Sequence, residues 1–195
     1  PDLSDAKRLQ YLGEAKFIRA HFYYHLVQQY GDVELKTEPT ESLITESYRT
    51  PAAEIWNFII DELKFCIDNI PEKQAVYGRI TREAVKHHLV RVYLTVKRSD
   101  EDILEAKRLA EEVIASSDHS LVNSHKNLWD MENKRNPEVL FPILFTQTVE
   151  LNGAGNELHV MFTASYSDHY PNALIRDLPY GRPWSRIRPT YYLQE

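Results

Sequence analysis

The chain has 195 residues, 43% of them hydrophobic, which suffices for one domain with a substantial core or for a piece of a larger protein. With 29 acidic against 23 basic residues, the net charge is −6, so we expect no nucleic-acid binding. No apolar run approaches the roughly 20 residues that span a bilayer, and no signal peptide opens the chain. Because it begins at Pro1 without an initiator methionine and stops inside a helix-like stretch, we expect a segment of a longer protein.

The first predicted element is a long helix that ends at Tyr30. Its apolar residues recur at steps of three or four, which is the spacing of one helical face, and they are Leu12, Ala15, Ile18, Phe22, Leu26 and Tyr30. A second stripe widens the apolar surface and consists of Ala20, Tyr23, Tyr24 and Val27. Such a helix is expected to lie between other helices, so we predict that Phe22 is buried and that these aromatic residues form core. Gly31 supplies the permissive backbone that a helix end prefers.

A polar stretch without periodicity, 36–49, predicts a long surface connection to a second helix. Thr50 and Pro51 are typical of a helix start, as N-cap and first-turn proline, and Pro71 ends the helix. Its apolar face consists of Ala52, Trp56, Ile59, Ile60, Leu63, Ile67 and Ile70. The single cysteine, Cys66, lies beside this face, which indicates a small buried thiol and excludes an intrachain disulfide.

A helical hairpin is predicted next. Thr81 is expected to cap a third helix, whose apolar residues are Val85, Leu89, Val92, Tyr93 and Val96. Ser99 or Asp100 caps a fourth helix over 101–117, with a buried stripe of Ile103, Ala106, Ala110, Val113 and Ile114. This hairpin has about the length of a tetratricopeptide repeat, although the strict repeat pattern is absent. We therefore predict an all-α, tetratricopeptide-like scaffold of helical hairpins with irregular loops over residues 1–149.

The character of the sequence changes after Leu121. Residues 127–130 predict a short turn or helix, in which Trp129, like Trp56, is interpreted as core. Residues 138–145 form an apolar run that contains Pro142, which predicts an edge or irregular strand. Residues 150–195 are predicted to be a loop-rich, aromatic segment of the same domain, because glycine and proline recur there without sustained periodicity.

Patterns for catalysis, metals and cofactors are missing from the sequence. His21 and His25 stand at i and i+4, but no third ligand is indicated, and Phe22 occupies the position where zinc hydrolases need glutamate. His87 and His88 are assigned no role. There is no P-loop, no Rossmann glycine pattern and no G-x-S-x-G elbow. We therefore predict no metal, no cofactor and no enzymatic activity.

The best candidate for a binding site lies in the aromatic segment 150–190. Aromatic faces pack against the C–H face of a pyranose, while amides, carboxylates and guanidinium groups satisfy its hydroxyls. The predicted glycan-binding residues are Trp184, Tyr166, Tyr170, His169, Asn172 and Arg182. Trp184, between Pro183 and Ser185, has no helical stripe to join and is the best single candidate. Each tyrosine is equally well explained as an anchor of the loops on the helical core.

Several segments, in the expected order, resemble the SusD/RagB family of nutrient-binding outer-membrane lipoproteins. The stretch from Gly13 to Val33 is similar to the family signature G-E-A-(R/K)-F-(L/I)-R-A followed by an aromatic helix and G-D-V, and Glu34 stands where the family usually has proline. Further similarity covers 59–71, 78–94, 106–114, 138–141 and 188–193.

The resemblance implies a SusD-like helical fold and a non-catalytic function. Such a protein would bind an oligosaccharide, or a peptide nutrient, at the cell surface and pass it to a SusC-like TonB-dependent outer-membrane transporter. It would be a surface-exposed lipoprotein of Bacteroidetes whose N-terminal lipid anchor lies upstream of Pro1. One alternative is a tetratricopeptide-type protein-interaction scaffold without a glycan site. A more distant one is a glycoside hydrolase, although the acidic pair Asp61–Glu62 is interpreted as a solvated helix face.

Overall fold

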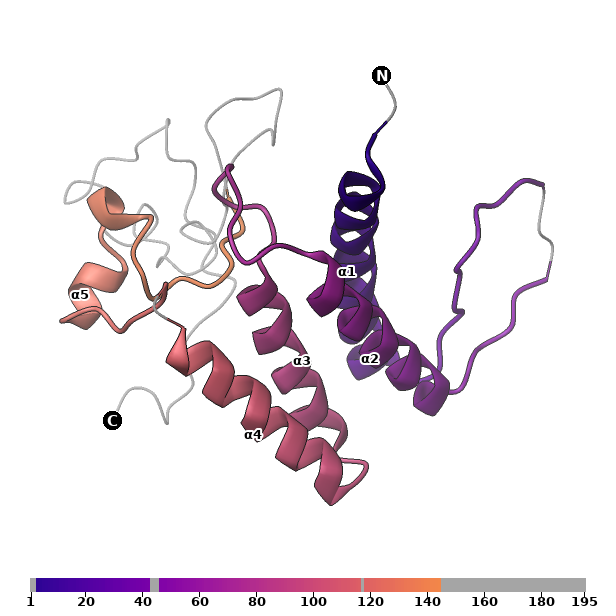
Figure 1. The fold of residues 1–195 in the computed structure, drawn as a ribbon. Coiled ribbons are helices and arrows are strands. Elements are labelled where there is room, and N and C mark those ends of the chain that lie inside the picture. Colours follow the sequence, from indigo (N-terminus) through magenta and orange to yellow (C-terminus); the bar gives the residue numbers. More distant parts are fainter. Residues whose placement is uncertain (1–2, 43–45, 117, 145–195) are drawn as a thin grey trace, which may run out of the picture. The chain divides into compact units, whose positions relative to one another are not determined.

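The computed structural model describes residues 3–42, 46–116 and 118–144 (Figure 1). Their elements are α1 (Asp5–Tyr30), α2 (Ala52–Asn69), α3 (Arg82–Val96), α4 (Asp100–Ala115), α5 (His125–Leu128) and the 3-10 helix η1 (Met131–Asn133). Within these ranges, the β-type pairing is limited to one isolated antiparallel bridge between Val33 and Thr50. The all-α prediction is confirmed. The strand predicted over 138–145 is wrong as far as residue 144, since Val139 N donates to Asn136 O in a turn (3.2 Å) and no ladder forms.

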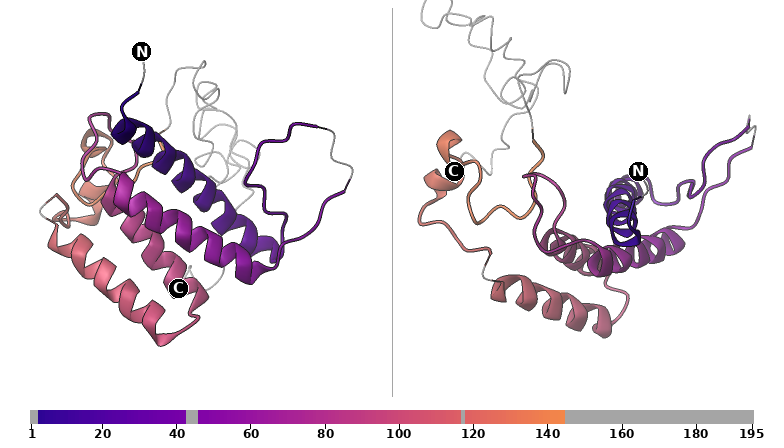
Figure 2. Two further views of the ribbon diagram at one scale, coloured as in Figure 1. Left: turned by 45° about the vertical axis from the view of Figure 1, so that its right-hand side comes forward. Right: turned by 45° about the horizontal axis from the view of Figure 1, so that its top comes forward.

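Contacts divide the chain into residues 1–142 and 143–195, and the helices belong to the first unit. Helix α1 packs on α2, α2 on α3 and α3 on α4, and the left view in Figure 2 shows this order. The structure therefore builds two helical hairpins that lie side by side. The domain boundary predicted after residue 149 lies outside the described residues and stays a prediction.

Helix α1 buries Ala20, Tyr24 and Val27 of the second predicted stripe but exposes much of the first. Its buried residues are Gln10, Gly13, Phe17, Ala20, Tyr24 and Val27. Phe22 lies about 140° around the helix from Phe17 and has 63% of its surface exposed, while Ile18 is 49% exposed. The prediction that Phe22 is buried is therefore wrong, because α2 and α3 cover only one side of α1 within the described residues.

Gly13 sets the close approach of α1 to α2. A methyl group at this position would lie 3.1 Å from Ile70 Cγ1, which is tighter than normal packing. Cys66 Sγ donates a hydrogen bond to the Gly13 carbonyl oxygen at 3.1 Å. Burial raises the pKa of the Cys66 thiol to about 12, with Glu62 adding to the shift. The prediction of a buried, unreactive thiol is confirmed.

Polar residues of α1 also hold the helix to its neighbours. The Glu62 side chain on α2 is only 5% exposed and accepts from Lys16 Nζ and, at 2.9 Å, from Arg19 Nε. Nearer the start of α1, Glu14 accepts two hydrogen bonds at 2.7 Å from Arg79, in the connection before α3. The interpretation of the pair Asp61–Glu62 as a solvated face is therefore wrong for Glu62, because its partners lie on a helix 43 or more residues away.

Two helices are capped by a side chain three residues from its partner, and α2 is capped by a side chain 20 residues away. Thr81 Oγ1 accepts from Ala84 N at 3.4 Å, and Ser99 Oγ accepts from Asp102 N at 3.3 Å, so both predicted caps are confirmed. Thr50 does not cap α2; Asp32 Oδ1 does, accepting from Ala52 N at 2.8 Å. In α4 the predicted stripe is partly wrong, since Ala106 and Leu109 are buried, whereas Ile103 is 38% and Ile114 is 80% exposed.

Replacing Asp32 by alanine is expected to lower the free energy of unfolding by about 1 kcal/mol, because the first turn of α2 loses its side-chain acceptor. Urea unfolding of the two proteins measures this change. Glu41→Ala is the matched control, since Glu41 is an exposed acidic residue of the same connection. Equal losses in the two variants would contradict the capping role.

Candidate functional site

The glycan-binding residues predicted from the sequence all lie outside the described residues. They are Trp184, Tyr166, Tyr170, His169, Asn172 and Arg182. The structure therefore neither brings them together nor separates them, and their role stays a prediction.

Three histidines meet between α1 and α3 in the described part of the chain. The ring of His21 lies 4.7 Å from that of His25 and 5.1 Å from that of His88, centroid to centroid. His88 is 4% exposed and packs edge-on against Phe17 at 5.5 Å. Its Nε2 is buried without a hydrogen-bond partner among the described residues. His88, assigned no role from the sequence, is thus a core histidine at the contact of two helices.

A hollow of about 370 Å³ opens beside these rings. It is lined by Phe17, His21, Ala84, His87, His88, Arg91, Glu138, Val139, Leu140 and Phe141. Within residues 3–42, 46–116 and 118–144, no three histidine, cysteine, aspartate or glutamate side chains are arranged to hold a metal ion. The wall offers aromatic and imidazole rings with one guanidinium group and one carboxylate, which suits small polar molecules better than metals.

Burial disfavours the protonated form of His21, His87 and His88. It lowers the pKa of His88 to about 3, and the neighbouring His21 and Arg91 add to the shift. Burial also lowers the pKa of His21, helped by His25 and Arg91, and that of His87, helped by Arg91. The folded state therefore resists protonation here, whereas the unfolded chain takes up a proton at each ring near pH 6.5.

Stability is expected to fall as the pH decreases below about 6.5, because only the unfolded state then protonates His88. The slope for one such group is up to about 1.4 kcal/mol per pH unit, so roughly 2 kcal/mol is lost between pH 7 and pH 5. His88→Gln removes this titration. The unfolding free energy of this variant should therefore fall less steeply with decreasing pH than that of the parent, by the slope that corresponds to about one proton. Urea unfolding at both pH values tests this, and parallel slopes in the two proteins would contradict it.

Trp129 follows α5 and is exposed, which overturns the prediction that it belongs to the core. Its side chain is 71% exposed, and its indole Nε1 donates to His125 Nε2 at 3.0 Å. A four-residue helix has no second turn with which to carry an apolar stripe, so no helical partner covers the ring in the described part of the chain. Trp56, by contrast, packs on the core with its ring 5.9 Å from Tyr24, as predicted.

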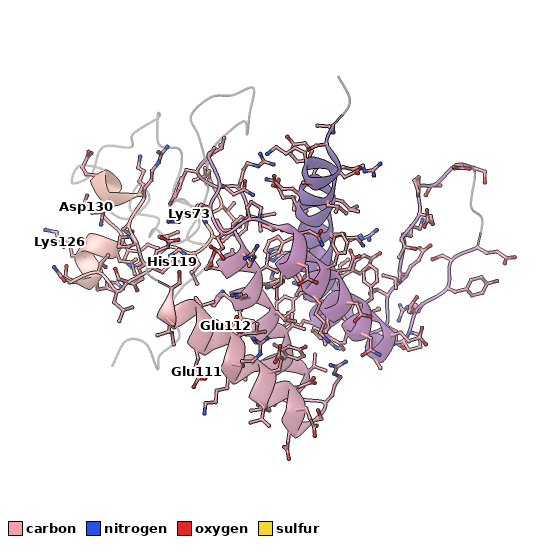
Figure 3. The ribbon with its side chains drawn as sticks, in the orientation of Figure 1. Lys73, Glu111, Glu112, His119, Lys126 and Asp130 are labelled. Carbon is pink, nitrogen blue, oxygen red and sulfur yellow. The ribbon has the colours of Figure 1, made fainter. Side chains whose placement is uncertain are left out.

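Charged side chains on and beside α3 and α4 form salt bridges with one another. Lys86 Nζ lies 2.8 Å from Glu112, and Lys73 Nζ lies 2.7 Å from Asp118. Figure 3 shows Lys73, Glu111 and Glu112 along this side of the helices. Because these charges pair with one another, this surface is a poorer candidate than the exposed ring of Trp129.

None of the described helices is long and apolar enough to cross a membrane.

Comparison with known proteins adds a family match. Residues 2–94 match the model of a SusD-like family described as starch-binding and associating with the outer membrane. A SusD-like protein of Bacteroides ovatus is 29% identical over 147 residues, which is 71% of this chain and 27% of the relative. The starch-binding protein SusD of Bacteroides thetaiotaomicron is 27% identical over 148 residues, 72% of this chain and 26% of its own.

Solved structures agree with the fold. A SusD superfamily protein from Bacteroides vulgatus, 27% identical, superposes with a TM-score of 0.64 over 75% of this chain and 31% of its own. A crystal structure determined with xylogluco-oligosaccharide gives a TM-score of 0.75 over 84% of this chain and 35% of its own, at 24% identity, which supports the fold alone. The chain thus spans about a quarter to a third of the length of the proteins it matches.

Proposed function

Because the chain belongs to the SusD/RagB family of SusD-like proteins, we propose that it is a non-catalytic protein that binds oligosaccharides at the outer membrane. The family description and the starch-binding relative support this proposal. Delivery to a SusC-like TonB-dependent transporter, and attachment as a surface-exposed lipoprotein, belong to the same proposal and rest on the family likeness.

The signature residues have packing roles in this structure, and this observation directs where the ligand should bind. Phe17 is core, Gly13 admits α2, Glu14 pairs with Arg79, and the Lys16 and Arg19 side chains reach Glu62 across the helix contact. The signature therefore specifies the scaffold. Sugar contacts are therefore expected outside the signature, and the aromatic residues predicted in the segment 150–190 stay the candidates.

Trp184→Ala is expected to weaken oligosaccharide binding about tenfold, since a ring stacked on a pyranose contributes on the order of 1–2 kcal/mol. Its free energy of unfolding should stay nearly unchanged. Calorimetric titration with a glycan identified on a binding array, together with a denaturant melt, gives both quantities. Tyr48→Ala is the control, because Tyr48 is an aromatic residue with 75% exposure in the connection before α2. A loss of stability in Trp184→Ala with unchanged affinity would show that Trp184 is a packing residue and not a glycan-binding one.

The alternative of a protein-interaction scaffold without a glycan site makes the opposite prediction for the array. Such a protein would bind no glycan on it, and Trp184→Ala would then have no affinity to lose. A glycoside hydrolase would release reducing sugar from the glycans it binds. The non-catalytic binding protein proposed here would release none.

A further inference from the structure

Trp129 presents an aromatic face that the described fold does not use. The indole N–H can only donate, so His125 Nε2 accepts the bond between them, and the proton of a neutral His125 ring lies on Nδ1. The two rings are 6.1 Å apart, centroid to centroid, at 60°. The polar edge of the indole is thereby satisfied and its orientation fixed. What remains for a ligand is the apolar face of the ring, in a residue that is 71% exposed.

The backbone that carries Trp129 is tied down by side chains on both sides. Ser124 Oγ accepts from Asn127 N at 3.2 Å to begin α5, and Asp130 Oδ1 accepts from Glu132 N at 2.9 Å to begin η1. Asn133 Nδ2 donates across the turn to Asn127 O at 3.0 Å. Because the backbone around Trp129 is already held in place, binding a ligand here costs little conformational entropy. A low entropic cost allows even a small contact area to contribute to affinity.

Three residues close to Trp129 in the sequence are polar and exposed, whereas Leu128, which directly precedes it, is apolar and half-buried. Lys126 and Asn127 precede this tryptophan and Asp130 follows it, and Figure 3 shows Lys126 and Asp130 at the α5 end of the molecule. Within the described residues, the side chains of Lys126 and Asn127 form no hydrogen bond or ion pair, and Asp130 uses one carboxylate oxygen. One aromatic face among donors and acceptors matches a sugar, whose ring has an apolar C–H face and a rim of hydroxyls. A protein partner would instead need a contiguous apolar patch.

We propose that Trp129 is a stacking platform for one pyranose ring of the bound oligosaccharide, with Lys126, Asn127 and Asp130 as partners for its hydroxyls. This inference rests on the proposed function. It concerns a residue of the helical unit and is independent of the residues predicted in the segment 150–190. His125 is a positioning residue, because it acts through the indole.

The test uses maltoheptaose and a xylogluco-oligosaccharide as probes, with the whole chain labelled with 5-fluorotryptophan. Trp56, Trp129 and Trp184 then give three fluorine signals, assigned by Trp→Phe variants. We expect the Trp129 signal to shift on addition of a probe, and Trp129→Ala to bind it about tenfold more weakly with a melting temperature close to that of the parent. Tyr48→Ala, which removes an equally exposed ring elsewhere, should bind normally.

The outcomes separate this inference from the proposed function. A shift of the Trp184 signal alone, with unchanged affinity in Trp129→Ala, overturns the Trp129 platform and leaves glycan binding in place. No shift and no binding of either probe contradicts both. A large loss of stability in Trp129→Ala also overturns the platform, because it assigns the ring to packing.

The positioning role of His125 has its own readout. His125→Ala removes the acceptor that fixes the indole, and we expect about threefold weaker binding of the probe, whereas His125→Gln keeps an acceptor and should restore affinity. Equal affinities in the two variants would contradict the positioning role.

Discussion

Replacing Phe17 by alanine is expected to lower the free energy of unfolding by about 3–5 kcal/mol. Phe17 is 3% exposed, and its ring meets His88 at 5.5 Å and Phe141 at 5.6 Å, both in edge-to-face geometry. It therefore joins α1 to α3 and to the chain after η1 at one point. Truncation would remove the aromatic contacts and leave a cavity that the helices on either side cannot close. Denaturant unfolding of the purified variants measures the loss.

Phe22→Ala is the matched control, since it makes the same chemical change five residues along the same helix. Its side chain is 63% exposed, so we expect a change within about 0.5 kcal/mol. A loss at Phe22 that equals or exceeds the loss at Phe17 would show that α1 is rotated about its axis relative to the structure.

These two phenylalanines show what periodicity can and cannot predict. Spacing in the sequence located α1 and its end at Gly31, because helix periodicity and the glycine stop are local properties. It also found both apolar stripes of the helix. The choice of the buried stripe depends on where α2 and α3 lie, which the spacing within α1 does not contain. Both stripes were predicted as core, and the structure buries Ala20, Tyr24 and Val27 of the second one. It also buries Phe17, which belongs to neither stripe, and exposes Phe22 of the first.

The same distinction separates the predicted caps from the missed one. Thr81 and Ser99 cap helices through bonds to residues three positions away, and both were recognised. Asp32 caps α2 from 20 residues away, across a connection that the sequence shows only as polar. Capping at short range is readable from residue type, whereas a cap brought in by a loop depends on how the loop closes.

The sequence supplies a criterion for candidate glycan-binding residues, and the residues that it selects in the segment 150–190 stay a prediction. Aromatic residues outside any helical stripe, set among amides and charges, led to Trp184 in the segment 150–190. Trp129 meets the same criterion, as it stands between Lys126, Asn127 and Asp130. The sequence nevertheless predicts Trp129 as core, and the structure exposes it. The bond from its indole to His125 depends on the turn geometry of α5, which the sequence alone does not supply.

Glu62→Ala is the second substitution with a large expected effect. The Glu62 side chain is 5% exposed and neutralises two cations from α1, namely Lys16 and Arg19, whose Nη2 lies 2.8 Å from the carboxylate. Removing one member of a buried ion pair costs about 3–5 kcal/mol, because the partner charge is left without compensation. We expect about 3 kcal/mol, the lower end, because the Lys16 and Arg19 side chains keep 22% and 32% exposure and regain water.

Two variants make this test specific. Asp61→Ala removes the neighbouring carboxylate, which is exposed, and should change stability by less than about 0.5 kcal/mol. Glu62→Gln keeps the shape and the acceptor oxygen while removing the charge, so its loss should lie between those of the two alanine variants. Urea unfolding at low and high salt supplies the measurement. Since a buried ion pair is screened less than an exposed one, the loss of stability in Glu62→Ala should persist at high salt. A loss below about 1 kcal/mol, or a loss that high salt abolishes, would contradict the prediction. Glu62 would then act as an ordinary surface charge, and apolar packing alone would hold α1 on α2.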